Sequence, residues 1–193
     1  TYNGTKYRAV TFSQYRPYST CNPSSTSKTY QDDNGYTPNN IYYFKYEPLK
    51  WRVLDPSTGF VLCESIIDAQ AYSNTVYGYG TDPYGHLADW NDAAHTCYAN
   101  DYATSSIRAW LNDDFYNIAF SSSQKANILT SKLDNKAYKT SYSEFDGETT
   151  YDKVFLLSWN EVQNTAYGFY ANTSSDTARA AKHTDYAECQ GLW

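Results

Sequence analysis

The sequence contains no methionine and few charged residues, and each shortage excludes a class of protein. Without a methionine the chain has no initiator residue, so we expect a processed or excised piece of a longer protein. Charged residues make up only 19% of the 193 residues, and aromatic residues make up 18%. So many aromatic side chains exclude a disordered acidic tail. The composition also excludes a collagen, a coiled coil and a low-complexity linker.

Long hydrophobic runs and an excess of positive charge are also absent. No stretch approaches the roughly 18 consecutive apolar residues of a membrane-spanning helix. The chain carries 15 Lys and Arg against 21 Asp and Glu, which gives a formal net charge of −6. The missing apolar run leads us to expect no membrane span. Because an acidic surface repels phosphate groups, we also expect no nucleic-acid partner.

Cysteine is scarce, and no two cysteines form a CxxC pair. The four are Cys21, Cys63, Cys97 and Cys189. The chain is rich in Tyr, Asn, Ser and Thr, as secreted and cell-surface proteins often are, so we predict an extracellular or cell-surface location. At least one disulfide would fit that location, although the sequence does not select its partners. Cys63 lies in the apolar run 60–63, and the alternative for it is a buried free thiol.

Strand patterns dominate the first third of the chain. The predicted strands are residues 7–15, 41–46, 49–54, 60–67 and, later, 154–157. The turn Pro56–Gly59 joins two of them into a hairpin, because Pro presets φ and Gly accepts positive φ. Leu49, Trp51 and Val53 alternate with basic residues, which assigns them to the core face of the strand.

Helical patterns follow in the second half. The most regular one places Ile107, Trp110, Leu111, Phe115 and Ile118 on one face behind an N-cap at Ser105. Shorter helices are predicted at 121–129, 158–165, 178–182 and 184–190, the last ending at Gly191, and Trp110 and Trp159 are assigned to the core. Long polar loops fill 17–40 and 72–103. We therefore predict an α+β fold with a modest, mostly antiparallel sheet, a few short helices and long loops.

Three segments taken together resemble a known family. They are Phe44–Leu54, Ser105–Phe120 and Asp152–Glu161, the last followed by Thr184–Ala187. Their order and spacing resemble DUF6273, an uncharacterised domain family of Gram-positive, largely Firmicute, surface and secreted proteins. The resemblance covers roughly residues 7–193 and implies a single domain over residues 1–193. It also implies a more distant similarity to C-type-lectin-like and formylglycine-generating-enzyme-like folds.

The resemblance breaks off at the end of the chain. Family members usually continue beyond the segment matching Thr184–Ala187 into further strands, whereas this chain stops at Trp193. We therefore expect the family's C-terminal strands to be missing here. A sheet without its last strands exposes unpaired edges, so another copy of the chain or a further domain would complete it.

The polar segment 72–102 is the strongest candidate for ligand binding. The six candidate residues within it are Tyr77, Tyr79, Tyr84, Trp90, Asn91 and Asp92. Sugars present flat apolar faces that stack on Tyr and Trp rings, while Asn and Asp bond their hydroxyl groups. Glycines between the rings let such a loop bend toward a ligand. The alternative is that these rings are packing anchors for a long loop.

Metal-binding patterns are weak. Asp32, Asp33 and Asn34 offer oxygen ligands that suit calcium, but they do not match the twelve-residue calcium loop with its closing Glu. The alternative is a solvated turn, because the same residue types form turns. His95 and Cys97 are too close in sequence for a structural zinc site. We therefore expect no cofactor, and calcium is the one alternative.

Two groupings would suit an enzyme. One is the set of carboxylates Glu144, Asp146, Glu148 and Asp152. Such a pair could hydrolyse a glycoside, although an acid-rich surface loop is more often a solvated face. The other pairs Cys189, as a nucleophile, with His183. The alternative is that Cys189 forms a disulfide with Cys97 or Cys21.

No established catalytic motif supports either grouping. The sequence therefore favours a non-enzymatic extracellular domain that binds carbohydrate or protein through its Tyr/Trp-rich loops. The alternatives are a structural subunit of a cell-surface assembly or filament, with open sheet edges paired between chains, and a secreted hydrolase.

Overall fold

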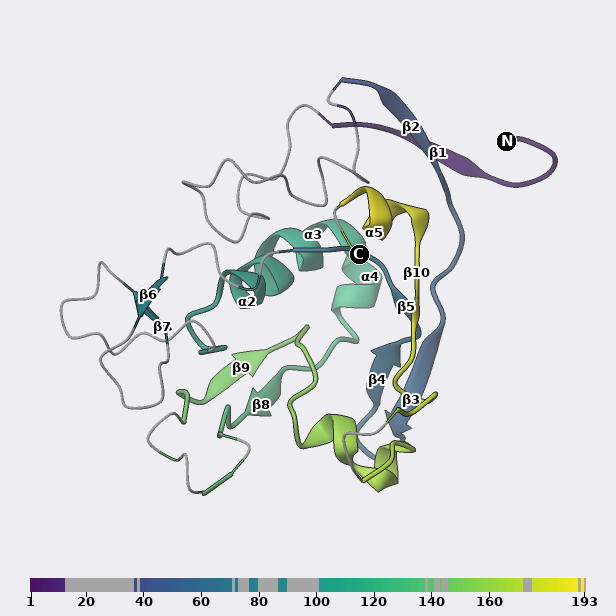
Figure 1. Ribbon diagram of the computed structural model, residues 1–193. Helices are drawn as coiled ribbons and strands as arrows, with labels where there is room; N and C mark the ends of the chain where they lie inside the picture. Colours follow the sequence, from purple (N-terminus) through teal and green to yellow (C-terminus); the bar gives the residue numbers. More distant parts are fainter. Residues whose placement is uncertain are drawn as a thin grey trace. The chain divides into compact units, whose positions relative to one another are not determined.

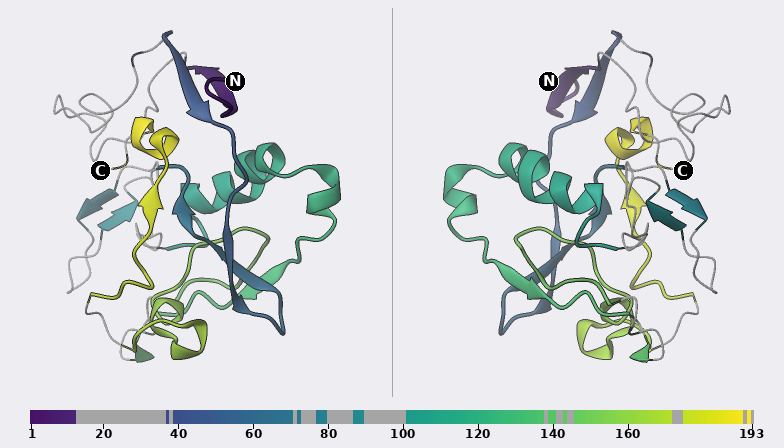
Figure 2. Two further views of the ribbon diagram at one scale, coloured as in Figure 1. Left: turned by 90° about the vertical axis from the view of Figure 1, so that its right-hand side faces the viewer. Right: turned by 90° about the vertical axis from the view of Figure 1, so that its left-hand side faces the viewer.

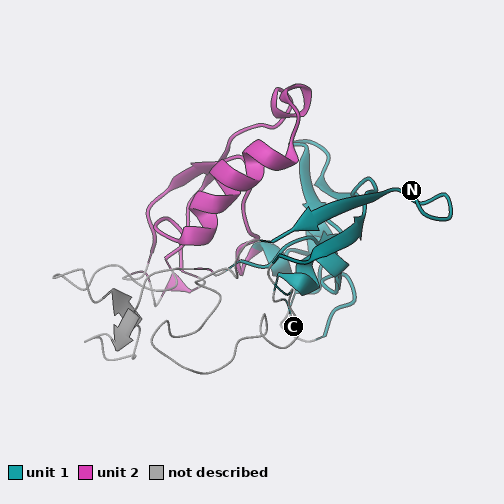
Figure 3. Ribbon diagram, turned by 90° about the horizontal axis from the view of Figure 1, so that it is seen from above, with its two compact units in different colours: residues 1–70, 161–193 teal, residues 71–160 magenta. Residues whose placement is uncertain are grey.

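The computed structural model describes most of the chain and divides it into two compact units. The described residues are 1–12, 37, 39–70, 72, 77–79, 87–89, 101–137, 139–140, 143, 146–171, 175–190 and 192. Unit 1 comprises Thr1–Gln70 and Glu161–Trp193, and unit 2 comprises Ala71–Asn160 (Figure 3).

The described elements are short strands and short helices, and β1 to β7 all precede the first described helix, α2 (Figure 1). Unit 1 contains β1 (Tyr7–Thr11), β2 (Ile41–Lys45), β3 (Trp51–Asp55), β4 (Phe60–Cys63), β5 (Ser65–Ile66), η3 (Glu161–Gln163), η4 (Thr165–Tyr167), β10 (Lys182–His183) and α5 (Asp185–Cys189). Unit 2 contains β6 (Tyr77–Tyr79), β7 (Leu87–Asp89), α2 (Ser106–Trp110), η1 (Leu111–Phe115), α3 (Tyr116–Ala119), α4 (Ser122–Lys125), β8 (Ser131–Leu133) and β9 (Thr150–Asp152).

The strands pair two by two rather than in one continuous sheet. Within the described residues, the pairs β1–β2, β3–β4, β6–β7 and β8–β9 are antiparallel, and β5–β10 is parallel. Short antiparallel pairs, short helices and long connections confirm the predicted α+β fold. The similarity to C-type-lectin-like domains stays a prediction.

Strands β1 and β2 of unit 1 form a two-stranded ribbon (Figure 2). An aromatic cluster anchors one face of this ribbon. Phe12, Tyr42 and Phe44 project from that face, and the Phe44 ring meets the Tyr186 ring of α5 edge-on at 5.2 Å. Helix α5 begins where the sequence predicts it, because the Thr184 hydroxyl accepts from the Ala187 backbone N–H. The opposite face of the ribbon has no such cover among the described residues.

The β3–β4 hairpin has the predicted turn but turns the other face inward. Gly59 takes a φ of +73° and closes the turn as expected. However, Trp51 is 41% and Val53 57% exposed, while Leu54 is only 5% exposed. The assignment of Leu49, Trp51 and Val53 to the core was therefore wrong.

Tertiary contacts on the opposite face of β3 explain that reversal. The Arg52 guanidinium donates to the Ala178 carbonyl at 2.7 Å, so this basic side chain belongs to the inner face. Leu54 is two residues beyond Arg52 and so lies on the same inner face. It is the residue without a cross-strand partner at the bulge between Val53 and Asp55. Side chains alternate between the two faces of a strand, so a shift of the pattern by one residue moves every side chain to the opposite face.

A buried carboxylate organises the turn that follows η4 in unit 1. Asp176 is 8% exposed and accepts from the backbone N–H groups of Tyr170 at 2.8 Å and Ala178 at 2.9 Å. These bonds, followed by the nearby Arg179 charge, keep the pKa of Asp176 below its ordinary value. Residues 178–182 form a turn and the start of β10 rather than the predicted helix.

The core of unit 2 lies under one helical run. Ser105 caps it as predicted, and α2, η1 and α3 follow one another without a break from Ser106 to Ala119. Ile107, Leu111 and Tyr116 are each 8% exposed and form the buried face. Ile118 was assigned to that face wrongly, since it is 84% exposed, and one π-helical turn at η1 rotates the residues beyond it.

Three further predictions in unit 2 have different outcomes. Ser121 and Gln124 form the predicted capping box, but α4 ends at Lys125 instead of continuing to Leu129. Residues 154–157 are not a strand, because pairing ends at Asp152 in β9. Trp159 is 49% exposed, so its core assignment was wrong. Trp110 is half-buried against Phe115 at 5.2 Å.

Candidate functional site

The structure fixes both ends of the Tyr-rich segment 72–102 at the start of α2. At one end, the Tyr72 carbonyl accepts from the Ile107 N–H at 3.0 Å, which satisfies a donor that the first helical turn leaves without a partner. At the other end, the Ser105 hydroxyl donates to the Tyr102 carbonyl at 2.8 Å and accepts from the Arg108 N–H at 3.3 Å. The N-cap of α2 therefore holds the segment as well as the helix.

Asp101 shapes the same end of the segment. One carboxylate oxygen of Asp101 accepts from the Ala103 N–H at 3.0 Å, and the other accepts from the Thr104 hydroxyl at 2.8 Å. Aspartate commonly forms this local turn, because its short side chain reaches backbone groups two or three residues ahead. The segment thus leads into α2 through a hydrogen-bonded turn.

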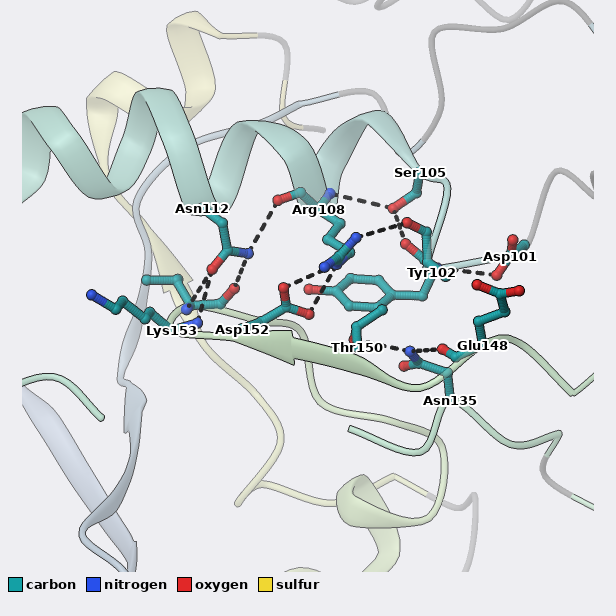
Figure 4. Close-up of polar contacts among 12 residues, drawn as sticks. Asp101, Tyr102, Ser105, Arg108, Asn112, Asn135, Glu148, Thr150, Asp152 and Lys153 are labelled. Atoms are coloured by element: carbon teal, nitrogen blue, oxygen red, sulfur yellow. Dashed lines mark hydrogen bonds and ion pairs between the residues drawn. The ribbon is translucent and has the colours of Figure 1, made fainter. Parts of the chain in front are cut away.

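An ion pair joins α2 to β9 directly beneath this turn (Figure 4). The Arg108 Nε atom lies 2.9 and 3.0 Å from the two Asp152 carboxylate oxygens, and Arg108 also donates to the Ala103 carbonyl at 3.0 Å. Asp152 is 2% exposed, and a buried charge requires a partner such as the Arg108 guanidinium. Arg108 therefore ties helix, strand and loop end together.

Asn112 makes a second link between the helix and the same strand end. Its side-chain amide donates to the Val154 carbonyl at 2.9 Å, and its oxygen accepts from the Lys153 N–H at 2.8 Å. The Asn112 side chain thus makes the hydrogen bonds that a neighbouring strand would make with the backbone after β9. Arg108, Asn112, Asp152 and Lys153 all belong to segments that carry the DUF6273 resemblance, which the structure brings together (Figure 4).

Tyr102 lies beside the ion pair with its hydroxyl buried (Figure 4). Burial, and then the Asp152 charge, raise the pKa of Tyr102 well above its ordinary value, so the phenol stays neutral at physiological pH. Among the described residues this hydroxyl makes no hydrogen bond of ordinary geometry, although the Leu156 backbone lowers the pKa slightly. The ring contributes packing rather than acid–base chemistry.

Asn135 closes the network on the far side of β9. With a φ of 48°, it donates from its side chain to the Glu148 carbonyl at 2.7 Å and the Thr150 hydroxyl at 3.0 Å. Its own carbonyl accepts from the Gly147 N–H at 2.9 Å. We call the network of Asp101, Tyr102, Ser105, Arg108, Asn112, Asn135 and Asp152 the polar frame.

Gly147→Ala is expected to disturb this frame. A Cβ atom at Gly147 would lie 2.9 Å from the Asp101 Oδ1 atom and 3.2 Å from the Asn135 carbonyl oxygen. The carboxylate can rotate away but the backbone carbonyl must shift, so we expect a loss of about 1–2 kcal/mol in the free energy of unfolding. Chemical denaturation would measure it, with Gly59→Ala as a comparison in which φ, not space, is limiting. An unchanged stability would contradict the packing of Gly147 against the frame.

The predicted ligand residues fall only partly within the described chain. Tyr77 and Tyr79 are the ends of β6, which pairs with β7 so that Tyr77 lies opposite Asp89 and Tyr79 opposite Leu87. The other four candidates, Tyr84, Trp90, Asn91 and Asp92, lie outside the described residues. The calcium candidates Asp32, Asp33 and Asn34 also lie outside them. Within the described residues no cluster of His, Cys, Asp and Glu could hold a metal ion.

The predicted carboxylate grouping does not form a catalytic pair among its described members. Asp152 is committed to Arg108, and Asp146 accepts from the Ala137 N–H at 2.8 Å. Glu148 is exposed, and Glu144 lies outside the described residues. The first two carboxylates thus hold the fold, which leaves no described acid and base facing one another.

The predicted Cys189–His183 nucleophile pair also lacks support. Burial, with the nearby charges of Glu188 and Asp185, raises the pKa of the Cys189 thiol, whereas an activated cysteine needs a lowered one. His183 is exposed, with a ring nitrogen 3.4 Å from the Thr184 carbonyl oxygen. Cys63 and Cys189 are free thiols. Cys63 is half-buried rather than fully buried, and Cys21 and Cys97 lie outside the described residues.

The frame residues and the helix they support fall within a family match that covers residues 57–191, more than half of the chain. The chain belongs to DUF6273, described as a domain of unknown function. The match includes the second and third resembling segments, while the first, Phe44–Leu54, precedes it. No curated protein and no solved structure matches the chain. None of the helices in the described part of this DUF6273 chain has the length and apolar character that crossing a membrane requires.

Sequence reasoning did not identify the polar frame as a unit. Arg108 and Asn112 belong to the resembling segment Ser105–Phe120, and Asp152 belongs to Asp152–Glu161. The resemblance alone does not connect the two segments. Their spacing was a usable signal, because Arg108 and Asn112 are four residues apart and so share a helix face. The sequence does not show that this face of the helix meets the end of β9.

Proposed function

We propose that this chain is an extracellular, non-enzymatic binding domain whose Tyr-rich segment 72–102 recognises carbohydrate or a surface protein. The binding residues in this proposal are Tyr77, Tyr79, Tyr84, Trp90, Asn91 and Asp92. The observation that carries it is the attachment of both segment ends, Tyr72 and Asp101–Ser105, to the polar frame. Binding residues are commonly found on loops that a rigid scaffold positions.

The energetics of the frame support a scaffold role. Burying a charge is costly unless it is paired, and the frame provides Asp152 with two close contacts to Arg108. Such a network resists rearrangement, because loss of one partner leaves the other charge without compensation. A segment attached to it loses less conformational entropy on binding than one with free ends.

The frame itself does not favour an enzyme. Among its described members, the charged groups of Arg108 and Asp152 bond to each other. Burial moves the pKa of Tyr102 further above neutral pH than that of an ordinary tyrosine. A catalytic acid or base must instead face a substrate and exchange a proton near neutral pH. These groups are therefore better suited to holding structure than to proton transfer.

The test is a glycan array and a panel of surface proteins, probed with the Tyr77→Ala/Trp90→Ala double variant. If these rings stack on a ligand, we expect binding to fall by about tenfold or more, with the melting temperature unchanged. The matched control is Tyr151→Ala/Trp159→Ala, which removes a Tyr and a Trp that are 64% and 49% exposed elsewhere in unit 2.

Three results would contradict the proposal. One is no binding to any glycan or protein by the unaltered chain. Another is an equal loss of binding in the test and control variants. The third is a test variant that binds normally but melts at a lower temperature, which is the behaviour expected if the rings are packing anchors.

A further inference from the structure

A second surface, in unit 1, is the outward side of the β3–β4 hairpin (Figure 1). Trp51 lies opposite Cys63, and Val53 lies opposite Val61. Residues directly opposite one another in an antiparallel pair share a face, so these two neighbouring pairs lie on one side of the hairpin. Val53 is 57%, Trp51 41% and Val61 40% exposed, and Cys63 is half-buried. We call Trp51, Val53, Val61 and Cys63 the outer face.

The other side of the same hairpin is already packed within unit 1. Leu54 is 5% exposed on that side, and Arg52 donates to the Ala178 carbonyl at 2.7 Å. Leu62, opposite Arg52, points to the same side and is half-buried. When one side of an antiparallel pair is packed, its solvent side normally carries polar residues. The apolar outer face departs from that rule.

The outer face carries no charged side chain. By alternation along the strand, Lys50 and Arg52 point away from the Trp51 side. Glu64 also belongs to the inner side, where it lies 3.5 Å from Arg52. Asp55 lies beyond the bulge, and its carboxylate accepts from a backbone N–H of the turn at 2.8 Å. The charges nearest to the outer face are therefore directed elsewhere.

This lack of charge favours a second copy of the chain as the occupant. Each copy has a net charge of −6, so two copies repel one another wherever their charged surfaces meet. An uncharged face avoids that repulsion. A two-fold axis brings the same residues of both copies together, and apolar side chains have no donor or acceptor that must find a match.

The size of the surface sets the strength that we expect. Together with Leu49, which precedes β3 and is 42% exposed, the outer face offers on the order of 300 Å² of apolar surface, which is comparable to the largest patches on monomeric proteins. Two such surfaces supply about half of the roughly 1,200 Å² buried in a stable interface. The expected complex is therefore a weak dimer whose population depends on concentration.

We propose that the outer face packs against the outer face of a second copy across a two-fold axis. Removal of Trp51, Val53 and Val61 from water would drive the association. A dimer would carry two Tyr-rich segments and so could raise the avidity of the proposed function for a repeating ligand. The outer face is separate from that segment, so each proposal can fail without the other.

The test is sedimentation equilibrium of the full chain over a range of concentrations. We expect a monomer–dimer equilibrium with a Kd on the order of 100 µM. Association should be tighter in about 0.5 M than in about 0.05 M salt, because salt screens the repulsion between the copies. Val53→Glu and, separately, Val53→Lys should each weaken association by about tenfold or more, because they place like charges in the interface.

Mixing the two charged variants separates a face-to-face contact from damage to the fold. An equimolar mixture of Val53→Glu and Val53→Lys should associate again, because each copy then meets a copy of opposite charge. The matched control is Tyr43→Glu in the β1–β2 ribbon of the same unit. Tyr43 is 67% exposed and shares its face with Lys45, so this variant should associate as the unaltered chain does.

Several results would overturn the proposal. A chain that stays monomeric at every concentration would exclude a second copy and would leave a different protein as the occupant. Association that weakens as salt rises would indicate charged contacts on another surface. Equal losses in Val53→Glu and Tyr43→Glu would also reject the outer face. So would a mixture of the charged variants that stays monomeric although both variants melt at the normal temperature.

Discussion

Replacing Asp152 by alanine is expected to lower the free energy of unfolding by about 3 kcal/mol, because it leaves the Arg108 guanidinium without its counter-charge. Arg108 donates to both Asp152 oxygens, and Asp152 is almost fully buried. The Arg108 side chain is 30% exposed, so water replaces part of what is lost and the effect stays at the lower end for a buried pair. Chemical denaturation followed by tryptophan fluorescence measures the change.

A double-mutant cycle separates the ion pair from the packing of either side chain. Arg108→Ala and Asp152→Ala should each destabilise the chain, and the double variant should lose clearly less than their sum. Glu148→Ala removes an exposed carboxylate four residues away and should change stability by less than about 0.5 kcal/mol. Additive losses in the cycle would show that the pair has no role in holding α2 to β9.

Asp152→Ala also connects stability with the proposed function. The same guanidinium donates to the Ala103 carbonyl, next to the end of the Tyr-rich segment. If the frame positions that segment, ligand binding should weaken under conditions in which the variant is still folded. Normal binding by folded Asp152→Ala protein would mean that the segment does not depend on the frame.

Replacing Leu54 by alanine is the second large effect that we expect, at about 3 kcal/mol lost in the free energy of unfolding. Leu54 is 5% exposed, so truncating it removes buried apolar surface and leaves a cavity. Val53, its neighbour in β3, is 57% exposed and should lose less than about 1 kcal/mol when changed to alanine. Denaturation of both variants under the same conditions gives the comparison.

This pair of variants decides which face of β3 is buried. The alternation of Leu49, Trp51 and Val53 predicts that Val53→Ala is the costly change. The structure predicts the opposite, because Arg52 bonds the Ala178 carbonyl and Leu54 follows it inward past the bulge. A larger loss for Val53→Ala than for Leu54→Ala would reject the observed register.

Local chemistry made several elements predictable. Ser105 and Ser121 cap their helices as predicted, because a cap depends on a hydroxyl and a backbone N–H a few residues ahead. Thr184, where the last helix was predicted to begin, caps α5 in the same way. The turn at Gly59 was predictable for a similar reason, since positive φ is a property of one residue. Family membership followed from motif order.

Predictions that needed a partner element were less secure. The apolar residues 154–157 were predicted to be a strand, but a strand needs a neighbour, and the Asn112 side chain takes that place at Lys153 and Val154. The exposure of Trp159 and Ile118 was likewise set by what surrounds each helix or turn. For the candidate site, composition identified the Tyr-rich segment but not the residues that hold its ends.

The sequence by itself determined the caps, the hairpin turn, the α+β composition and membership of DUF6273, because each depends on neighbouring residues or on the order of motifs. The tertiary structure decided which face of β3 is buried, where pairing ends after β9, and that Arg108 meets Asp152 across forty-four positions. Those outcomes depend on distant groups competing for the same hydrogen bonds and the same buried space. A local sequence pattern does not show which distant groups compete for them.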